Sequence, residues 1–595
     1  MKFPYGLADF DALRREGYVY LDRTPYLRVV EERGKQLVFL RPRRFGKSLW
    51  LSVLANYYDL ARADDFDLLF GDLAIGQNPT PLHNQYFILR WDFSKVAAFG
   101  RVDEIARALH DHINARVIDF GIRYADRLTQ VPQIDRENAI FSFESLLSAI
   151  AGQPHKLYLL IDEYDNFANE IAMGGARSED DRYQAMVTGD GILKTLFKNV
   201  KAAMGEGRLG RVFITGVSPM LLSDLTSGFN TATDITLERQ THDLCGFTED
   251  EIAGLTQQVG AGCGFTAAQI EDALQLMRTF YNGYTFRHDA PGVIYNPTLS
   301  LYFLDILQRE CEPPSEMLDV NLSMDKNKLE YIASRPGGTQ LIQALLENQQ
   351  DVGIQRIVNR FQLQDLVKPT QEADNLASLL FYFGMVTVSG RTQSGKLRLQ
   401  IPNLVTRGLY FEQLRELLLP DVSRRDEGRA AAEELWSMGD PEPLCAFITA
   451  HVYRAFSNRD YRHANELTVK AIFLSLLYND LMFIVDSEPE LDRRYADFTM
   501  ILRPEYRPYQ LFDLLVEFKY VELGQTGLSA AQIRAQSQAE LTALPAVQTA
   551  FAEARAALAA YRATLQAKYG ALLKLRVYAI VSLAFEQLLW MEIGA

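Results

Sequence analysis

The feature that most constrains the fold of this chain is a short apolar segment, Gln36 to Leu40, followed by the string RPRRFGKSLW and a helix-like pattern. Gly46, Lys47 and Ser48 match the second half of the phosphate-binding loop G-x-x-x-x-G-K-[ST], in the strand-loop-helix context that this loop requires. Arg41 stands where the first glycine is usual. The alternative is a simple helix start with a surface lysine.

If the string is a phosphate loop, each of its parts has a chemical role. Backbone N–H groups at the start of the helix would surround the phosphates, Lys47 would neutralise β and γ oxygens, and Ser48 would ligate Mg²⁺. We therefore predict an ATP site. Its loop residues are Arg44, Phe45, Gly46, Lys47 and Ser48.

A second segment supports the nucleotide site. Lys156 to Asn166 reads KLYLLIDEYDN, a buried strand pattern that ends in two carboxylates. Asp162 would hold Mg²⁺, and Glu163 would polarise the water that attacks the γ-phosphate. In the next strand pattern, RVFITGVSP, Thr215 could contact the γ-phosphate, while Ser218 could do the same or cap a helix. The alternative for the two carboxylates is a solvated acidic turn.

The length and composition exclude several classes of protein. A chain of 595 residues is too long for one hydrophobic core. The net charge of −15 argues against a protein coated in nucleic acid, although it leaves room for a local basic groove. The four cysteines show no C-x-x-C pairing, so we expect neither a disulfide framework nor a zinc site. Without a leader-like or membrane-spanning run of apolar residues, we expect a cytoplasmic protein.

The chain divides by pattern into three regions. Strand-like and helix-like runs alternate over 1–290, which predicts an α/β P-loop domain with a parallel sheet and a helical lid that opens on a capping box of Thr248 and Glu251. Over 291–428, helices surround a hairpin pattern, FGMVTVSGRTQSGKLRLQIP, an order compatible with a winged-helix module. The third region, 429–595, carries the pattern described next.

Leu511 to Tyr520, LFDLLVEFKY, reads as a strand with an acid and a lysine two positions apart. Because side chains alternate along a strand, Glu517 and Lys519 point the same way while Leu514, Val516 and Phe518 point into a core. An earlier strand-like run, RYADFTMIL, carries Asp497. Two such strands could hold a divalent metal between Asp497 and Glu517, with the Lys519 ammonium beside it, which is nuclease chemistry.

Two features of this region have a second interpretation. The Glu517 and Lys519 pair could lie on a solvated edge strand. Asp513 lies on the same face of the strand as this pair but outside the motif, so it could be mistaken for a metal ligand. Four arginines with interleaved tyrosines could bind phosphates or form a solvated loop. The arginines are Arg493, Arg494, Arg503 and Arg507, and the tyrosines are Tyr495, Tyr506 and Tyr509.

Several strings, in order, resemble those of AAA-ATPase-like proteins with a C-terminal PD-(D/E)XK nuclease-superfamily domain. They are GLADFDALRREGYVYLDRTPYL, LRPRRFGKSLWLSVLANYY, LLIDEYD, FITGVSP, CGFTEDEI, and YNGYTF with IYNPTLS. In that family the phosphate loop is written R-P-R-R-F-G-K-[ST], which Arg41 matches. The resemblance covers nearly the whole chain and implies ATP binding.

The same resemblance implies a restriction-endonuclease-like α/β domain at the C-terminus. Its core has an acid on a helix, then an aspartate, then (D/E)-x-K. Glu466, in NELTVKAIFLSLLY, would be the helical acid, followed by Asp497, Glu517 and Lys519. Lys519 would orient or deprotonate the attacking water, and the metal would stabilise charge on the scissile phosphate.

From these observations we expect an ATP-binding, metal-dependent nuclease that acts on nucleic acid, DNA in particular, with ATP and Mg²⁺ as cofactors and no membrane partner. A function of another class is also compatible with the sequence: a nucleotide-switched binding or assembly protein whose C-terminal domain binds nucleic acid without cleaving it. The sequence also leaves open whether the chain forms a homo-oligomer.

Overall fold

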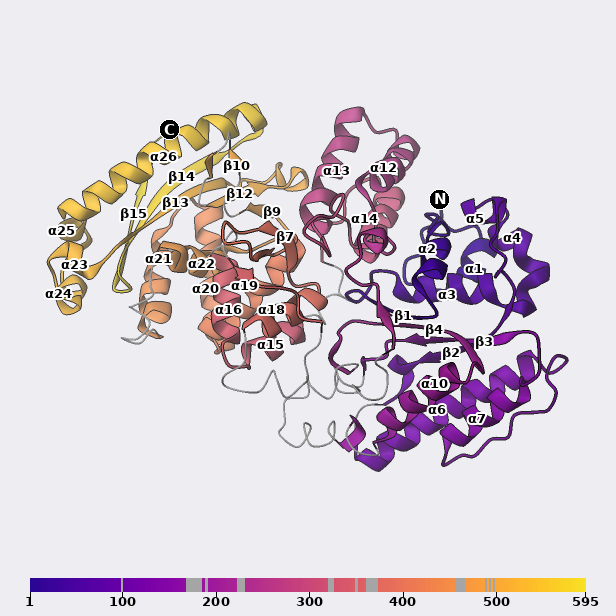
Figure 1. Ribbon diagram of the computed structural model, residues 1–595. Coiled ribbons are helices and arrows are strands. Elements are labelled where there is room, and N and C mark those ends of the chain that lie inside the picture. Colours follow the sequence, from indigo (N-terminus) through magenta and orange to yellow (C-terminus); the bar gives the residue numbers. More distant parts are fainter. Residues whose placement is uncertain are drawn as a thin grey trace. The chain divides into compact units, whose positions relative to one another are not determined.

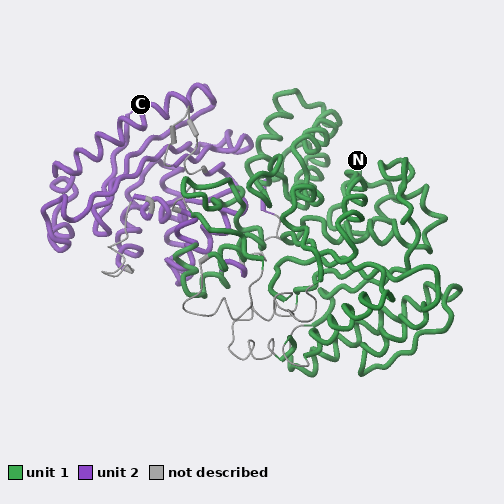
Figure 2. The backbone as a smooth tube through the Cα atoms, viewed as in Figure 1, with its two compact units in different colours: residues 1–314, 330–341, 350–403 green, residues 315–329, 342–349, 404–595 purple. Residues whose placement is uncertain are grey.

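The fold is taken from a computed structural model of the full chain. It describes residues 1–595 apart from 98–99, 167–184, 188–190, 222–230, 319–325, 348–351, 360–372, 456–465, 487–489, 492–493, 496–497 and 595. The chain forms two compact units, coloured separately in Figure 2. Unit 1 comprises residues 1–314, 330–341 and 350–403, and unit 2 comprises 315–329, 342–349 and 404–595.

Unit 1 is built on a five-stranded parallel sheet with the order β2-β3-β4-β1-β5. The strands are β1 (Gln36–Leu40), β2 (Tyr86–Asp92), β3 (Lys156–Asp162), β4 (Leu209–Gly216) and β5 (Thr233–Asp234). The predicted parallel sheet is therefore confirmed. Since β1, β3 and β4 are all nearly fully buried runs, both faces of the sheet are covered, as parallel sheets require.

Helices cover this sheet (Figure 1). They are α1 (Phe10–Arg15), α2 (Tyr26–Arg33), α3 (Lys47–Tyr58), α4 (Phe66–Phe70), α5 (Ala74–Gln77), α6 (Val102–Arg123), α7 (Ala139–Ala149) and α10 (Ile192–Gly205). Helix α3 begins within the string RPRRFGKS, so the position of α3 fixes one end of the loop that this string forms.

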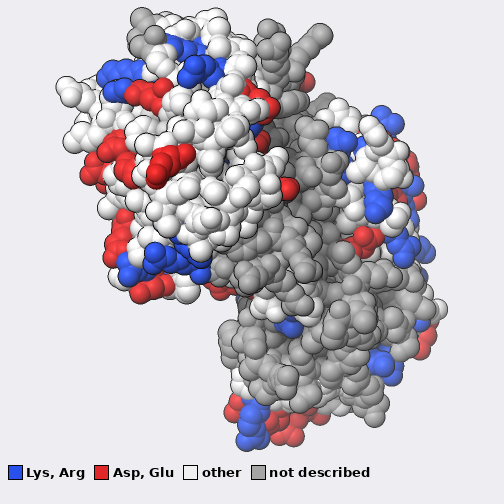
Figure 3. Space-filling view, turned by 90° about the vertical axis from the view of Figure 1, so that its left-hand side faces the viewer, with Lys and Arg blue, Asp and Glu red and all other residues white. Residues whose placement is uncertain are grey.

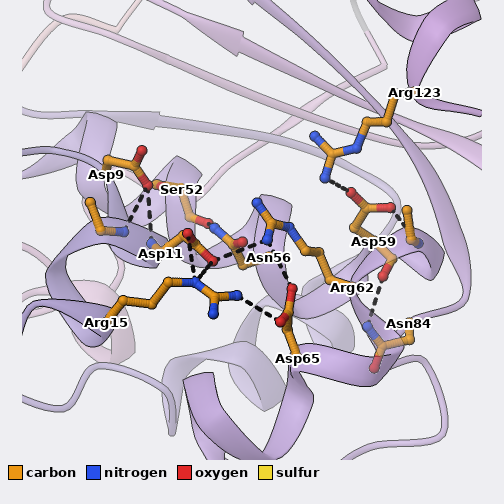
Figure 4. Close-up of polar contacts among 12 residues, drawn as sticks. Asp9, Asp11, Arg15, Ser52, Asn56, Asp59, Arg62, Asp65, Asn84 and Arg123 are labelled. Carbon is orange, nitrogen blue, oxygen red and sulfur yellow. Dashed lines mark hydrogen bonds and ion pairs between the residues drawn. The ribbon is translucent and has the colours of Figure 1, made fainter.

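The end of α3 is fixed by Asp59, whose side chain is fully buried. Its carboxylate accepts hydrogen bonds from the Ala61 N–H and the Tyr124 hydroxyl, both at 2.8 Å, and pairs with Arg123 (Figure 4). The Asn84 amide donates to the Asp59 carbonyl at 2.7 Å. These contacts tie α3 to α6 and to the start of β2, so the helix behind the phosphate loop has a fixed anchor.

A helical segment follows the sheet, as predicted. It consists of α12 (Glu249–Cys263), α13 (Ala267–Tyr281) and α14 (Pro297–Glu310). Thr248 and Glu251 form the predicted capping box at the start of α12. Cys263 and Cys311, at the ends of α12 and α14, form a disulfide, which corrects the expectation of no disulfide. Their spacing of 48 residues did not indicate the pairing, because only the packing of α12 on α14 brings the two thiols together.

The predicted hairpin is also confirmed. Strands β7 (Thr387–Arg391) and β8 (Leu397–Gln400) pair antiparallel, and β6 (Gly353–Ile354) adds to the other edge of β8. Helix α18 (Ala373–Tyr382) precedes the hairpin and α19 (Leu404–Leu418) follows it, while α15 (Lys326–Ala333) and α16 (Gly338–Glu347) come earlier in the chain.

Unit 2 contains a mixed five-stranded sheet with the order β15-β14-β13-β12-β9. Its strands are β9 (Phe483–Asp486), β12 (Phe498–Leu502), β13 (Asp513–Val521), β14 (Leu575–Leu583) and β15 (Gln587–Glu592). Only β13 and β14 are parallel. A separate two-stranded ribbon joins β10 (Glu490–Leu491) to β11 (Arg494–Tyr495), so the described parts of the run RYADFTMIL belong to two different sheets.

Helices pack on both faces of the unit 2 sheet. Leu515 and Val521 belong to a core with α26 (Pro545–Tyr569), whereas the Phe518 ring packs at a tilt against Phe473 of α22 (Glu466–Leu477), with ring centroids 5.0 Å apart. The remaining helices are α20 (Val422–Ser437), α21 (Glu442–Phe447), α23 (Leu523–Thr526), α24 (Ala530–Ala535) and α25 (Gln538–Thr542). Strand β13 is therefore central and covered on both faces.

Candidate functional site

The string RPRRFGKS forms a loop between β1 and α3 in unit 1. Arg44 and Gly46 both have left-handed backbone, with φ of 67° and 93°. Glycine adopts this conformation without strain, and Gly46 caps the start of α3 without any side-chain hydrogen bond. The first N–H groups of a helix have no partners within it, so this end of α3 is suited to bind an anion.

Arg41 has a structural role at the position of the missing first glycine. Its side chain is 1% exposed and donates to the carbonyls of Leu40, Thr236, Thr241 and His242 at 2.7 to 3.2 Å. Burial lowers the pKa of the guanidinium to about 10. Arg41 therefore holds the loop on the segment that follows β5, and it faces away from solvent.

Lys47 lies at the centre of the polar groups that follow the strands. Its ammonium, 3% exposed, donates to the Pro42 carbonyl at 3.1 Å and lies 3.4 Å from a carboxylate oxygen of Glu163. Glu163 itself has a left-handed φ of 47°, which aims its side chain away from the line of β3. The loop lysine and the second carboxylate of IDEYD thus form an ion pair.

Asp162 ends β3 and is almost completely buried. The Arg90 guanidinium donates to it at 3.0 Å, and the Ser48 hydroxyl hydrogen-bonds to it as well. Burial raises the pKa of the Asp162 carboxyl, an effect that the Arg90 charge partly offsets. A hydroxyl beside a carboxylate is a pair of hard oxygen donors of the kind that Mg²⁺ prefers, so Ser48 and Asp162 fit this ion.

Strand β4 contributes a hydroxyl at the same edge of the sheet. Thr215 is fully buried beside Phe39 of β1, and its Oγ1 has no hydrogen-bond partner within the described part of the chain. The Ser218 hydroxyl and backbone N–H donate to Asp165 at 3.0 and 2.6 Å. Asp165, which our sequence reasoning missed, therefore joins the ends of β3 and β4.

A cavity of about 350 Å³ opens beside the loop. The loop and Glu163 form its polar side, and its other walls are largely apolar and come from distant parts of unit 1. Those walls include Leu7, Val19, Leu21, Trp50, Val53, Phe247, Leu255 and Leu301. We did not predict these residues, although the strings GLADFDALRREGYVYLDRTPYL and CGFTEDEI contain several of them. A cavity with one polar side and otherwise apolar walls suits a nucleotide, whose phosphates are polar and whose base is aromatic.

The second candidate site lies in unit 2, on β13. The Lys519 ammonium donates to Glu517 Oε1 and to Glu466 Oε1, both at 3.1 Å, and to the Phe518 carbonyl at 2.8 Å. The Glu517 side chain is 9% exposed and that of Lys519 17%. The pair therefore does not lie on a solvated edge. Glu466 and Glu517 supply carboxylate oxygens, the kind of ligand that Mg²⁺ prefers, and the Lys519 ammonium already balances part of their charge.

Asp497 lies outside the described residues. Within the described residues, the pairing of β12 with β13 ends at Phe498 and Val516. Phe498 follows Asp497 in the sequence, and Val516 precedes Glu517. Among the residues that the structure describes, no group of three or more His, Cys, Asp and Glu side chains is placed to hold a metal ion.

The other charged residues near β13 are structural. Asp513 is fully buried, pairs with Arg507 at 2.6 Å and accepts the backbone N–H groups of Leu502 and Lys574 at 2.8 Å. Arg503 is fully buried and donates to backbone carbonyls, so the suggestion that it grips phosphates is wrong. Arg493 lies outside the described residues.

In the described part of the chain, no helix is long and apolar enough to cross a membrane.

Comparison with known proteins gives a family match and distant likenesses to a curated protein and to a solved structure. A protein of Azotobacter chroococcum mcd 1, described as "Uncharacterized protein in vnfD 5'region", is 24% identical over 555 residues, which are 91% of this chain and 93% of that protein. The structure of the Aeropyrum pernix ORC1 protein in complex with DNA matches with 13% identity and a TM-score of 0.25, over 68% of this chain and 94% of that chain. A likeness at this level supports no argument about fold or partners.

The family match covers the N-terminal part of the chain. Residues 4–226 match the AAA-ATPase-like family, described as "Predicted AAA-ATPase". The phosphate loop, Asp162, Glu163 and Thr215 all lie within these residues. By sequence family and by its parallel sheet, the segment 4–226 is thus similar to AAA-ATPases.

Proposed function

We propose that this protein binds and hydrolyses ATP in unit 1 and cleaves nucleic acid, DNA in particular, at a metal-dependent site in unit 2. The ATP site is supported by the family match and by the cavity that adjoins the loop. The nuclease site is supported by one observation above all: Lys519 joins the carboxylates of Glu466 and Glu517, which come from a helix and a central strand.

In the ATP site, each residue acts on a different part of the nucleotide. The N–H groups at the start of α3 bind the phosphates, and Lys47 neutralises the charge on the β and γ oxygens. Ser48 and Asp162 would hold Mg²⁺. Glu163, kept in position by Lys47, accepts a proton from the attacking water, and the buried Thr215 hydroxyl is a donor for the γ-phosphate.

In the nuclease site, Glu517 and Asp497 would hold the metal, and Glu466 positions Lys519 from the side of α22. Lys519 orients the attacking water and neutralises the negative charge that builds up on the phosphate. Mg²⁺, when bound, supplies positive charge that stabilises the phosphoryl oxygens at both sites.

Cleavage assays test the proposal. The purified protein is incubated with single-stranded and double-stranded DNA, with Mg²⁺ or Mn²⁺, and with or without ATP. We expect cleavage that needs the metal and that a Glu517→Gln variant lacks. A protein that binds ATP but leaves every DNA and RNA substrate intact would favour the rival function, a nucleotide-switched binding protein.

A further inference from the structure

The small sheet of unit 1 carries an excess of positive charge. We call β6, β7, β8 and the residues next to them, 352–359 and 387–400, the basic hairpin. These two segments contain no aspartate or glutamate. They contain four cationic side chains, Arg356, Arg391, Lys396 and Arg398. The local charge is therefore strongly positive in a chain whose net charge is −15.

The Asp374 carboxylate accepts the Gln355 N–H at 3.0 Å, but no ion pair joins it to Arg356 in the described part of the chain. Arg391 donates to the Gly395 carbonyl at 2.7 Å and lies 3.5 Å from His288 Nε2. Arg356, Lys396 and Arg398 form no ion pair with any carboxylate that the structure describes. Most other arginines of unit 1 are paired, for example Arg287 with Asp289 beside the hairpin. The positive charge of the basic hairpin is thus available to an external anion.

Arg398 occupies a special position in the sheet. Its cross-strand neighbours are Gly353 on β6 and Gly390 on β7. Directly opposite residues share a face of a sheet, so the arginine lies between two positions that have no side chain. A Cβ at Gly390 would meet no atom within 4 Å, whereas a Cβ at Gly353 would lie 3.0 Å from the Thr392 side chain and 3.2 Å from the Lys396 side chain, so only the Gly390 side is open. An open glycine such as Gly390 allows another backbone to approach the strand closely.

The basic hairpin is held firmly on unit 1. Its inner face buries Ile354, Val388 and Leu399. The Thr285 N–H donates to the Thr387 hydroxyl at 2.6 Å, and that hydroxyl donates to the Thr285 carbonyl at 2.9 Å. The cations are therefore presented by a supported sheet, which reduces the entropy lost when they bind.

On the face drawn in Figure 3, basic and acidic side chains of the described residues are interspersed. Attraction of a polyanion depends on the local field, so a protein with this overall charge needs a local basic surface to bind one.

We propose that the basic hairpin is a nucleic-acid interface that binds the phosphate backbone of duplex DNA, separately from the nuclease site. The choice of polyanion rests on the proposed function. Arg398 contacts the backbone beside Gly390, and Arg356 and Lys396 add phosphate contacts. Such contacts are independent of base sequence.

The test measures binding without cleavage. A fluorescent duplex is titrated with the Glu517→Gln protein in EDTA, at several salt concentrations, by fluorescence anisotropy. The same measurement is made after Arg356→Gln, Lys396→Gln and Arg398→Gln together. A matched control changes three exposed cations elsewhere in unit 1, Arg107→Gln, Arg136→Gln and Lys198→Gln. Both triple variants lose the same net charge.

We expect the hairpin variant to bind about tenfold more weakly or worse, and the slope of log K against log[salt] to become shallower by about 2 to 3, since each phosphate contact contributes about 0.9. The control should bind like the parent. Should the hairpin variant fail to fold, Lys396→Glu alone, on the turn, should still weaken binding.

The outcomes separate this proposal from the proposed function. Equal affinity and equal slope for the hairpin and control variants, with a parent that binds DNA, would overturn the interface alone. A parent that binds DNA through the hairpin but never cleaves it would support the interface and overturn the nuclease. Tighter binding of the hairpin to acidic protein or to anionic vesicles than to DNA would overturn the choice of partner.

Discussion

The ammonium of Lys519 lies 3.1 Å from a carboxylate oxygen of Glu466, although the two residues are 53 positions apart in the chain. The same ammonium lies 3.1 Å from Glu517. The start of α22 and the middle of β13 therefore meet at one point. This juxtaposition is what makes the E-x-K segment a candidate reaction site and more than a charged pair on a strand.

The first prediction concerns this site. Asp497→Asn should abolish metal-dependent cleavage, because it removes the charge of a ligand. Lys519→Ala should leave metal binding largely intact and slow the chemical step, which lowers kcat more than it changes KM. Isothermal titration with Mn²⁺ and single-turnover cleavage separate the two effects. Cleavage that survives Asp497→Asn would contradict the assignment.

The second prediction concerns the loop lysine. Lys47→Ala removes a buried ammonium that we propose contacts the phosphates. Charge-assisted hydrogen bonds contribute about 1.5 to 3 kcal/mol, so ATP binding should weaken roughly tenfold or more. Equilibrium binding of a fluorescent ATP analogue measures the change. Lys198→Ala, on the exposed side of α10, serves as the control and should bind normally.

The third prediction separates ATP binding from hydrolysis. Glu163→Gln keeps the size of the side chain but removes the base, so ATP should still bind while turnover falls by about 100-fold or more. Phosphate release measured beside nucleotide binding distinguishes the two. Turnover at the parent rate would mean that another group polarises the water.

The fourth prediction is that Asp513 stabilises unit 2 and takes no part in catalysis. Asp513→Asn breaks a buried ion pair with Arg507, so unfolding should become easier by about 2 to 4 kcal/mol. Asp426→Asn, an exposed residue of the same unit, should change stability little. Denaturant unfolding of the two variants makes the comparison. At a temperature where both are folded, Asp513→Asn should cleave DNA like the parent.

The fifth prediction concerns His242 and acid. Its Nε2–H donates to the Gly292 carbonyl at 3.0 Å, and burial, aided by the Arg41 charge, lowers the pKa of the ring to about 4. The unfolded chain binds a proton near pH 6.5 and the folded chain does not, so stability should fall as pH drops from about 6.5 to about 4, by up to about 3 kcal/mol.

His242→Gln retains a donor for Gly292 but cannot titrate. Between pH 7 and pH 5, the free energy of unfolding of this variant should therefore change less than that of the parent. An identical pH dependence in both proteins would show that other groups cause the loss of stability.

The sequence by itself determined the local features of this protein. The strand from Gln36 to Leu40, the loop and helix that follow it, the capping box at Thr248 and the hairpin from Thr387 to Gln400 all lie where the patterns predict them. Each depends on residues that are close together in the chain. Periodicity, glycine placement and cap residues report local conformation directly.

Only the tertiary structure decided which distant residues meet. It buries Arg41 and Arg503 among carbonyl groups, pairs Cys263 with Cys311, and places Lys519 against Glu466. A charged or polar residue looks the same in sequence whether it faces solvent, a ligand or a buried partner. Its role depends on the order of strands in a sheet and on the packing of helices over it, because these fix which long-range contacts compensate for burial.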